Sequence, residues 1–166
     1  MCRKLKKIIS LLLALAVMLS FSLTGTAAFA SEIKYSDIVI DADKLSSDSP
    51  SDNAKIFQAA FDEAKNKASD ENRYRIYLPK GEYHINTTLN IFSNTELYLD
   101  EDTTLVQDAP KGQNRVKAGD FSQKHILYNG FRNIKIDGGK WNMQFNGSCA
   151  MRFGHCTNLS ISNVHI

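Results

Sequence analysis

The carboxylates of this sequence are grouped in ways that could support acid–base chemistry. Asp100, Glu101 and Asp102 are consecutive, and Asp137 precedes the pair Gly138-Gly139. Two carboxylates at a fixed separation can act as the acid and the base of a hydrolysis. Charge runs are, however, usually solvated, and Asp-Gly is a common turn signal. We therefore interpret both groups as turns rather than as a catalytic pair.

No metal-ligand pattern accompanies these carboxylates. The four histidines, His84 and His165 among them, are dispersed along the chain, and we expect them to be surface or packing residues. Neither a paired C-x-x-C nor an H-x-x-x-H arrangement occurs. Cys149 and Cys156 could close a small disulfide or stay unpaired, and the geometric demands of a bridge favour two free thiols. The sequence therefore predicts no metal and no cofactor.

The chain opens with a targeting segment. Four basic residues in "MCRKLKK" precede an apolar run over residues 8–23, and Ala28-Phe29-Ala30 provides a small-residue cleavage site. These are the features of a secretory signal peptide. A membrane anchor is the alternative, since the run approaches spanning length, but the cleavage site favours removal. We expect residues 1–30 to be cut off, leaving no stable membrane anchor, and the protein to be secreted or held at the cell surface.

Charge is unevenly distributed along the rest of the chain. Residues 31–110 contain 8 basic and 16 acidic residues, whereas residues 111–166 contain 8 basic and 2 acidic residues. The slightly basic charge of the whole chain comes from the leader, so it gives no support for a nucleic-acid binder. Basic residues of the second half either form a face that attracts a polyanion or simply solvate the surface. They include Lys111, Arg115, Lys117, Arg132, Lys135, Lys140 and Arg152.

One helix and many short strands must position these groups. Residues 31–50 hold a strand at 38–40 and a turn-rich linker. Apolar residues at helical spacing then predict an amphipathic helix over 52–68 with Asp52 as its N-cap. Strands at 75–78 and 83–85 flank a Pro-Lys-Gly turn, and every later apolar run is short.

A displacement of 25 residues relates residues 125–141 to residues 150–166. Under this shift Asn133 matches Asn158, apolar positions match apolar positions, and an earlier copy follows Asn94. Such a repeat predicts a stack of parallel strands about 4.8 Å apart, with an apolar interior and a ladder of asparagines.

Two further expectations depend on the repeat. The Pro-, Gly- and charge-rich stretch 107–121 should be a loop that projects from the stack. Trp141 and Phe131, which could serve as sugar-stacking platforms, coincide with Ile166 and Cys156 under the 25-residue shift. We therefore expect both aromatic rings to pack in the interior.

Three segments resemble the pectin lyase-like superfamily. "SDNAKIFQAAFDEA" is similar to its A-I-Q-x-A-(I/L)-D-x-A helix, "IYLPKGEYHI" to its V-x-(L/F)-P-x-G-x-Y strand pair, and "NIKIDGGKW" to its N-(I/V)-x-I-x-G-G-x-(W/I) segment. "DADKLSSDS" departs from the glycine-rich turn that usually precedes the helix. The resemblance covers nearly all of residues 38–166. It implies an all-β, right-handed parallel β-helix, with a capping helix and the first coils in residues 51–166.

Within the superfamily, the chain resembles the N-terminal part of polygalacturonase-type glycoside hydrolases, whose catalytic carboxylates occur in N-x-D and D-D elements. Neither element occurs in residues 31–166, so the catalytic residues are unknown and are expected beyond Ile166. This implies the N-terminal fragment of an exported, polysaccharide-degrading hydrolase, inactive as a fragment. A polysaccharide lyase, which would typically use calcium, and a non-catalytic, adhesive cell-surface solenoid stay open as alternatives. In each case the expected partner is a polysaccharide, a uronate polymer if the basic residues share one face, and not a nucleic acid.

Overall fold

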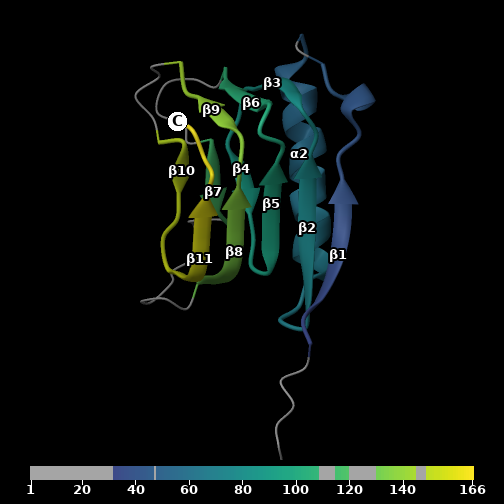
Figure 1. The fold of residues 1–166 in the computed structure, drawn as a ribbon, viewed down its shortest axis with the longest axis vertical. Coiled ribbons are helices and arrows are strands. Elements are labelled where there is room, and N and C mark those ends of the chain that lie inside the picture. Colours follow the sequence, from purple (N-terminus) through teal and green to yellow (C-terminus); the bar gives the residue numbers. More distant parts are fainter. Residues whose placement is uncertain (1–31, 47, 109–114, 120–129, 145–148) are drawn as a thin grey trace, which may run out of the picture. The chain divides into compact units, whose positions relative to one another are not determined.

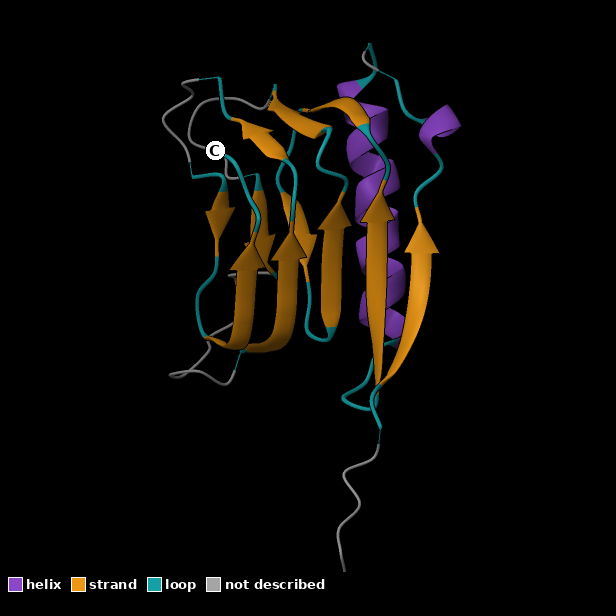
Figure 2. Cartoon of the chain, viewed as in Figure 1, coloured by secondary structure: helices purple, strands orange, loops and turns teal. Residues whose placement is uncertain are grey.

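The computed structural model describes residues 32–46, 48–108, 115–119, 130–144 and 149–166. These residues form parallel β-sheets, a long helix α2 (Pro50–Lys67) and a short 3-10 helix η1 (Ala42–Lys44), as Figures 1 and 2 show. Within this part of the chain, no helix has the length and apolar character needed to cross a membrane.

Eleven strands are distributed over three sheets in the described residues. The long sheet contains, in spatial order, β1 (Lys34–Val39), β2 (Asn72–Leu78), β5 (Thr95–Leu99), β8 (Phe131–Asp137) and β11 (Cys156–Ser162). The second sheet contains β3 (Gly81–Ile85), β6 (Thr103–Gln107) and β9 (Lys140–Asn142). The third contains β4 (Leu89–Ile91), β7 (Val116–Ala118) and β10 (Met151–Arg152). The strands of the long sheet lie side by side in Figure 1.

The chain visits the three sheets in rotation. It passes through β3, β4 and β5, then through β6, β7 and β8, and then through β9, β10 and β11. We call each such set of three strands a rung. Every strand of one rung pairs in parallel with the corresponding strand of the next. The mainly parallel β-structure with one long helix agrees with the expected fold class and is consistent with a parallel β-helix.

The register between β8 and β11 confirms the 25-residue repeat. Leu159 pairs with Ile134, and Ile161 pairs with Ile136. The expected asparagine ladder is also present and reaches one rung further, because Asn158 Nδ2 donates to Asn133 Oδ1 and Asn133 Nδ2 donates to Asn94 Oδ1, both at 2.7 Å. All three residues have φ between 54° and 63°. Asparagine is one of the few non-glycine residues that tolerate this left-handed backbone, which explains its use at the turn.

The expectation that residues 107–121 form a projecting loop is wrong in part. Val116 and Ala118 are fully buried in β7, which pairs with β4. Met151 of β10 consequently pairs with Val116 instead of residue 126, the partner that a uniform 25-residue shift requires. The sequence pattern did not predict this strand, because β7 is only three residues long and lies among charged and glycine residues. Residues 109–114 and 120–129 fall outside the described part of the chain.

Apolar side chains of successive rungs form rows inside the stack. Ile76 pairs with Leu97 and Leu97 pairs with Ile136, and all three are buried. Trp141 is buried as expected, and its Nε1–H donates to the carbonyl oxygen of Gly138. Phe131 is half-buried and packs against the same core.

The long helix begins at Pro50, so the prediction of Asp52 as its N-cap is wrong. Ser49 occupies the N-cap position and makes no side-chain cap bond. Proline fits the first turn because its missing N–H would have no helical partner there. Asp52 instead lies within the first turn, where its charge suits the helix dipole and pairs with Lys55.

The helix covers the strand edges at the start of the stack, as expected. It buries Phe57 and Phe61 against the core. Gln58 takes the place of a neighbouring strand for β4, since its amide accepts from Asn90 N at 2.8 Å and donates to Asn90 O at 3.1 Å. Asn53 donates in the same way to the carbonyl oxygen of His84 in β3. Side-chain amides of the helix thus satisfy backbone groups that an open sheet edge would leave unpaired.

The opposite end of the stack exposes apolar side chains. Leu159, Ile161 and Ile166 are 39%, 45% and 82% exposed, although the residues that they continue in earlier rungs are buried. This end of the stack therefore presents an apolar face, and β11 is an edge strand among the described residues.

We predict that Gln58→Ala lowers the free energy of unfolding by about 2 kcal/mol, because it leaves the backbone N–H and C=O of Asn90 without their partners. Lys55→Ala is the matched control on the same helix, since its ion pair with Asp52 is exposed and should contribute less than about 0.5 kcal/mol. Urea unfolding of the three proteins measures both effects. Equal stability of Gln58→Ala and Lys55→Ala would show that the helix does not cap the β4 edge in this way.

Candidate functional site

The outward face of the long sheet carries polar and aromatic side chains in rows. Alternate residues of a strand point to opposite faces, and the parallel register places outward residues of neighbouring strands next to one another. One row contains Asp37, Arg75, Glu96 and Lys135, and the next contains Val39, Tyr77, Tyr98 and Asp137.

Glu96 is the centre of the first row and is only 7% exposed. Its carboxylate accepts a 2.7 Å hydrogen bond from the hydroxyl of Tyr98 and lies 3.7 Å from Nε of Arg75. The guanidinium of Arg75 also stacks over the ring of Tyr35 at 3.6 Å. Burial of this carboxylate is therefore balanced by a hydroxyl donor and a neighbouring cation.

Tyr98 connects the two rows. Its ring stacks on that of Tyr77 with centroids 5.2 Å apart, and Lys135 Nζ lies 4.6 Å from the centroid of Tyr98. Lys135 also donates to the Tyr98 hydroxyl at 3.2 Å and to Asp137 at 2.9 Å. These contacts hold the side chains of Tyr98, Lys135 and Asp137 in one arrangement at the ends of β5 and β8.

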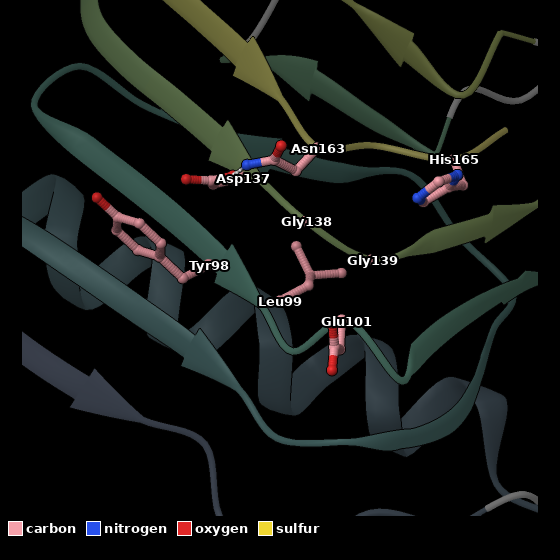
Figure 3. Close-up of a pocket in the computed structure, with 8 residues that line it drawn as sticks. All are labelled: Tyr98, Leu99, Glu101, Asp137, Gly138, Gly139, Asn163 and His165. Atoms are coloured by element: carbon pink, nitrogen blue, oxygen red, sulfur yellow. Dashed lines mark hydrogen bonds between the residues drawn. The ribbon is translucent and has the colours of Figure 1, made fainter.

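A groove of about 520 Å³ lies beside this arrangement. It crosses three successive strands of the long sheet, because its residues come from the end of β5, the end of β8 and the segment after β11. The volume is within the range of pockets that bind small molecules. Figure 3 shows the residues that line it: Tyr98, Leu99, Glu101, Asp137, Gly138, Gly139, Asn163 and His165.

Two glycines form the floor of the groove. Gly138 has a φ of 89°, and a side chain there would bring its Cβ to 2.3 Å from the carbonyl oxygen of Leu99. Only glycine allows the turn after β8 to lie directly against the turn after β5. Asp137, which the sequence predicts to be a turn residue, is instead the last residue of β8, and Gly138-Gly139 connect β8 to β9. The tight packing of this connection also shapes the groove.

Asp137 accepts hydrogen bonds from two neighbouring side chains at the groove. Hydrogen bonds from Lys135 and from Asn163, the latter at 2.7 Å, lower the pKa of its carboxyl group. Figure 3 shows the Asn163 contact. Asp137 is thus held as a carboxylate, which accepts hydrogen bonds and donates none.

The acidic run before β6 forms an exposed turn, as expected. Asp100 Oδ1 accepts a hydrogen bond from the backbone N–H of Asp102, whose carboxylate lies 3.6 Å from Lys140 in an exposed ion pair. Glu101, in contrast, lines the groove. Its place there is not predictable from the acidic run itself, because the sequence of one turn does not show which turn of the next rung it meets.

A family model described as rhamnogalacturonase A/epimerase, pectate lyase-like, matches residues 40–166. The chain belongs to this family. The match confirms the resemblance to the pectin lyase-like superfamily and indicates a carbohydrate-active protein with a polysaccharide substrate. No curated protein and no solved structure matches the chain.

This pectate lyase-like protein has a second group of titratable side chains, on the β3-β6-β9 sheet. His84 Nδ1 lies 2.8 Å from Asp108 and Nε2 lies 3.3 Å from Glu82. Burial lowers the pKa of His84, but the hydrogen bonds to Asp108 and Glu82 raise it, and the net shift is upward. His84 is therefore not the isolated residue that the sequence predicts. The sequence contained one indication of the contact between His84 and Asp108. These residues are 24 positions apart, which is nearly the separation of Tyr83 and Leu105, a pair that β3 and β6 place side by side.

The basic residues of the second half do not share one face. Arg132 and Lys135 lie on the long sheet, Lys140 on β9, and Lys117 and Arg152 on the β4-β7-β10 sheet. Lys111 lies outside the described residues. Two of them pair with acidic residues of the first half: Arg132 donates two bonds of 2.8 and 3.0 Å to Asp70, and Lys140 lies 3.6 Å from Asp102.

Arg115 is the exception among these residues, because it is fully buried. Its Nη1 donates to the carbonyl oxygen of Ile85, and burial lowers its pKa to about 10. Arg115 therefore belongs to the interior rather than to an anion-binding surface.

Neither thiols nor acidic residues form a metal centre in the described ranges. Cys149 and Cys156 are free thiols, and burial raises the pKa of Cys156. Across residues 32–46, 48–108, 115–119, 130–144 and 149–166, no group of three or more His, Cys, Asp or Glu residues could hold a metal ion.

We predict that Asp137→Asn lowers the free energy of unfolding by about 1 kcal/mol at about pH 7, because the charge-assisted bond from Lys135 is lost. The folded-state pKa of Asp137 lies below its unfolded-state value. The carboxylate therefore stabilises the fold above the unfolded-state pKa, and this contribution disappears as the pH falls through the folded-state pKa. Urea unfolding at about pH 7 and about pH 3 should show a difference between the two proteins that shrinks in acid.

Asp102→Asn is the matched control for this prediction, because it removes the same charge from an exposed ion pair. Its effect should stay below about 0.5 kcal/mol at either pH. A loss of stability in Asp137→Asn that is equally large at both pH values would contradict the assignment of an ionised, hydrogen-bonded Asp137.

Proposed function

We propose that this chain is the N-terminal part of an exported, polysaccharide-degrading glycoside hydrolase of the pectate lyase-like family. The observation that carries the proposal is the groove on the outward face of the long sheet, in a chain whose residues 40–166 match that family. The groove offers carboxylate, amide and imidazole groups to sugar hydroxyls, which are both donors and acceptors.

We further propose that the sheets belong to a right-handed parallel β-helix with additional rungs after Ile166. The rotation of the chain through three parallel sheets supports a solenoid. The exposed Leu159 and Ile161 support further rungs, because the same row is buried wherever another rung covers it.

The catalytic carboxylates are proposed to lie on those later rungs. Residues 31–166 lack the N-x-D and D-D elements of polygalacturonase-type hydrolases. One R-x-K triplet, which such hydrolases also carry, does occur at Arg115-Val116-Lys117, but the burial of Arg115 removes it from the surface. The groove described above would then serve as a subsite that holds the polysaccharide beside the reacting bond.

A lyase and a non-catalytic binder of the same fold are the alternatives. Hydrolysis leaves a new reducing end and a saturated sugar, elimination leaves an unsaturated sugar, and a binder leaves the polymer intact. Product analysis with the protein that includes the later rungs separates the three.

The proposed export of the protein depends on the signal peptide expected in residues 1–30. Residues 1–30 lie outside the described part of the chain, so the proposal depends on the basic, apolar and Ala28-Phe29-Ala30 segments alone. N-terminal sequencing of protein recovered from the culture medium should begin at Ser31. Recovery of the chain only inside the cell, with Met1 or Cys2 at its start, would contradict export.

The binding part of the proposal is tested by retention on immobilised pectic polysaccharide. We expect Tyr98→Ala to weaken binding at least about fivefold, because Tyr98 lines the groove and orients Lys135. Asn163→Ala, which removes an exposed groove side chain, should weaken binding in the same direction without disturbing the core.

Tyr35→Ala is the matched control, since Tyr35 is an exposed tyrosine of the long sheet that does not line the groove. Its retention should equal that of the unmodified chain. If all three variants bind as tightly as the unmodified chain, the polysaccharide does not occupy this groove.

A further inference from the structure

We propose that the groove between Tyr98 and His165 binds a neutral sugar residue and disfavours a uronate. This inference rests on the proposed function, because it specifies the sugar that the same groove accepts. It concerns the chemistry of the groove lining and of the outward face around it.

The lining of the groove is acidic and rich in hydrogen-bond acceptors. Glu101 and Asp137 both line it, whereas neither lysine nor arginine is among the described residues of the lining. Sugar hydroxyls can donate to these carboxylates. The carboxylate of a uronate has no proton to donate at neutral pH and would meet like charge, which is a common means of excluding a wrong ligand.

Lys135, which contacts two residues of the groove lining, is already engaged. Lys135 Nζ contacts Asp137 at 2.9 Å and the hydroxyl of Tyr98 at 3.2 Å. A uronate could recruit this ammonium only by displacing Asp137, which would leave a second carboxylate without its partner. The ion pair between Lys135 and Asp137 therefore favours a ligand that brings no charge of its own.

Other cations on the outward face of the long sheet are engaged in the same way. Arg75 lies beside Glu96 and stacks on Tyr35, and Arg132 makes two hydrogen bonds to Asp70. Each of these contacts joins neighbouring parts of the stack. Lys135, Arg75 and Arg132 thus each lie beside an acidic residue, whereas Arg73, on the same face, has a buried Nε without a hydrogen-bond partner in the described structure. Ion pairing therefore reduces the positive charge that this face offers to a polyuronate.

An apolar hollow adjoins the groove and fits the same class of ligand. It has a volume of about 310 Å³, shares Tyr98 and Leu99 with the groove, and is also lined by Val39, Tyr77 and Pro79. Val39 is 72% exposed there. A neutral saccharide presents C–H faces and hydroxyl edges, so one ligand can contact the apolar hollow and the acceptor-rich groove together.

The test compares two ligands that differ only at C6. One is an oligogalacturonate, and the other is the same oligomer after reduction of its carboxyl groups to hydroxymethyl groups. Calorimetric titration of the full chain at low salt, about 20 mM, preserves the electrostatic contribution. We expect the reduced oligomer to bind at least about tenfold more tightly than the oligogalacturonate.

Glu101→Gln links that preference to the groove, because it removes one charge from an exposed turn and keeps the side-chain size. It should strengthen oligogalacturonate binding at least about threefold relative to the reduced oligomer. Glu63→Gln is the matched control, since it removes the same charge from the exposed side of α2, where Glu63 pairs with Lys67. It should leave the ratio of the two affinities unchanged.

The possible outcomes separate this inference from the proposed function. Tighter binding of the oligogalacturonate would overturn the neutral-sugar inference while supporting polysaccharide binding. A neutral preference that Glu101→Gln does not reduce would overturn its assignment to this groove. Binding of neither oligomer, nor of pectic polysaccharide, would overturn the proposed function and the inference with it.

Discussion

Backbone hydrogen bonding between successive rungs is the constraint from which the other features of this structure follow. Parallel strands pair in a fixed register, so each rung must place equivalent residues directly beside those of the rung before it. This produces the apolar row of Ile76, Leu97 and Ile136 inside the stack and the asparagine ladder at its turn. The groove has the same origin, because Glu101, Asp137 and Asn163 come from successive rungs.

The same bonding leaves an open edge at the first rung, on β3 and β4, whereas β5 pairs with β2. Side-chain amides of the helix make the hydrogen bonds that a neighbouring strand would otherwise make. Gln58 bonds both backbone groups of Asn90, and Asn53 bonds the carbonyl oxygen of His84. An open edge invites pairing with other chains, so these two amides stabilise the fold and also limit association at this end.

Sequence periodicity predicts the stack well because the interior repeats the same chemistry on every rung. The repeat correctly aligned Asn133 with Asn158 and placed Trp141 in the core. It did not reveal β7, because that strand has only three residues and Lys117 separates its buried Val116 and Ala118. Alternation records which side chains point outward, but it does not record which of them meet across rungs.

The site was therefore the least predictable part of the molecule. The contacts of His84 with Asp108 and of Lys135 with Tyr98 join residues 24 and 37 positions apart. Counting charges along the chain indicated a basic second half, whereas the structure pairs Arg132 with Asp70 from the first half. Charge composition is additive along a sequence, but a surface potential depends on the partner that each charge finds.

The central claim is that polysaccharide binds on the outward face of the long sheet, at the groove between Tyr98 and His165. Backbone amide chemical shifts recorded during titration with a carboxyl-reduced pectic oligosaccharide test it most directly. The account predicts the largest changes at Leu99, Gly138 and Asn163 and almost none on the β4-β7-β10 sheet. Changes confined to the β3-β6-β9 sheet around His84 would contradict it.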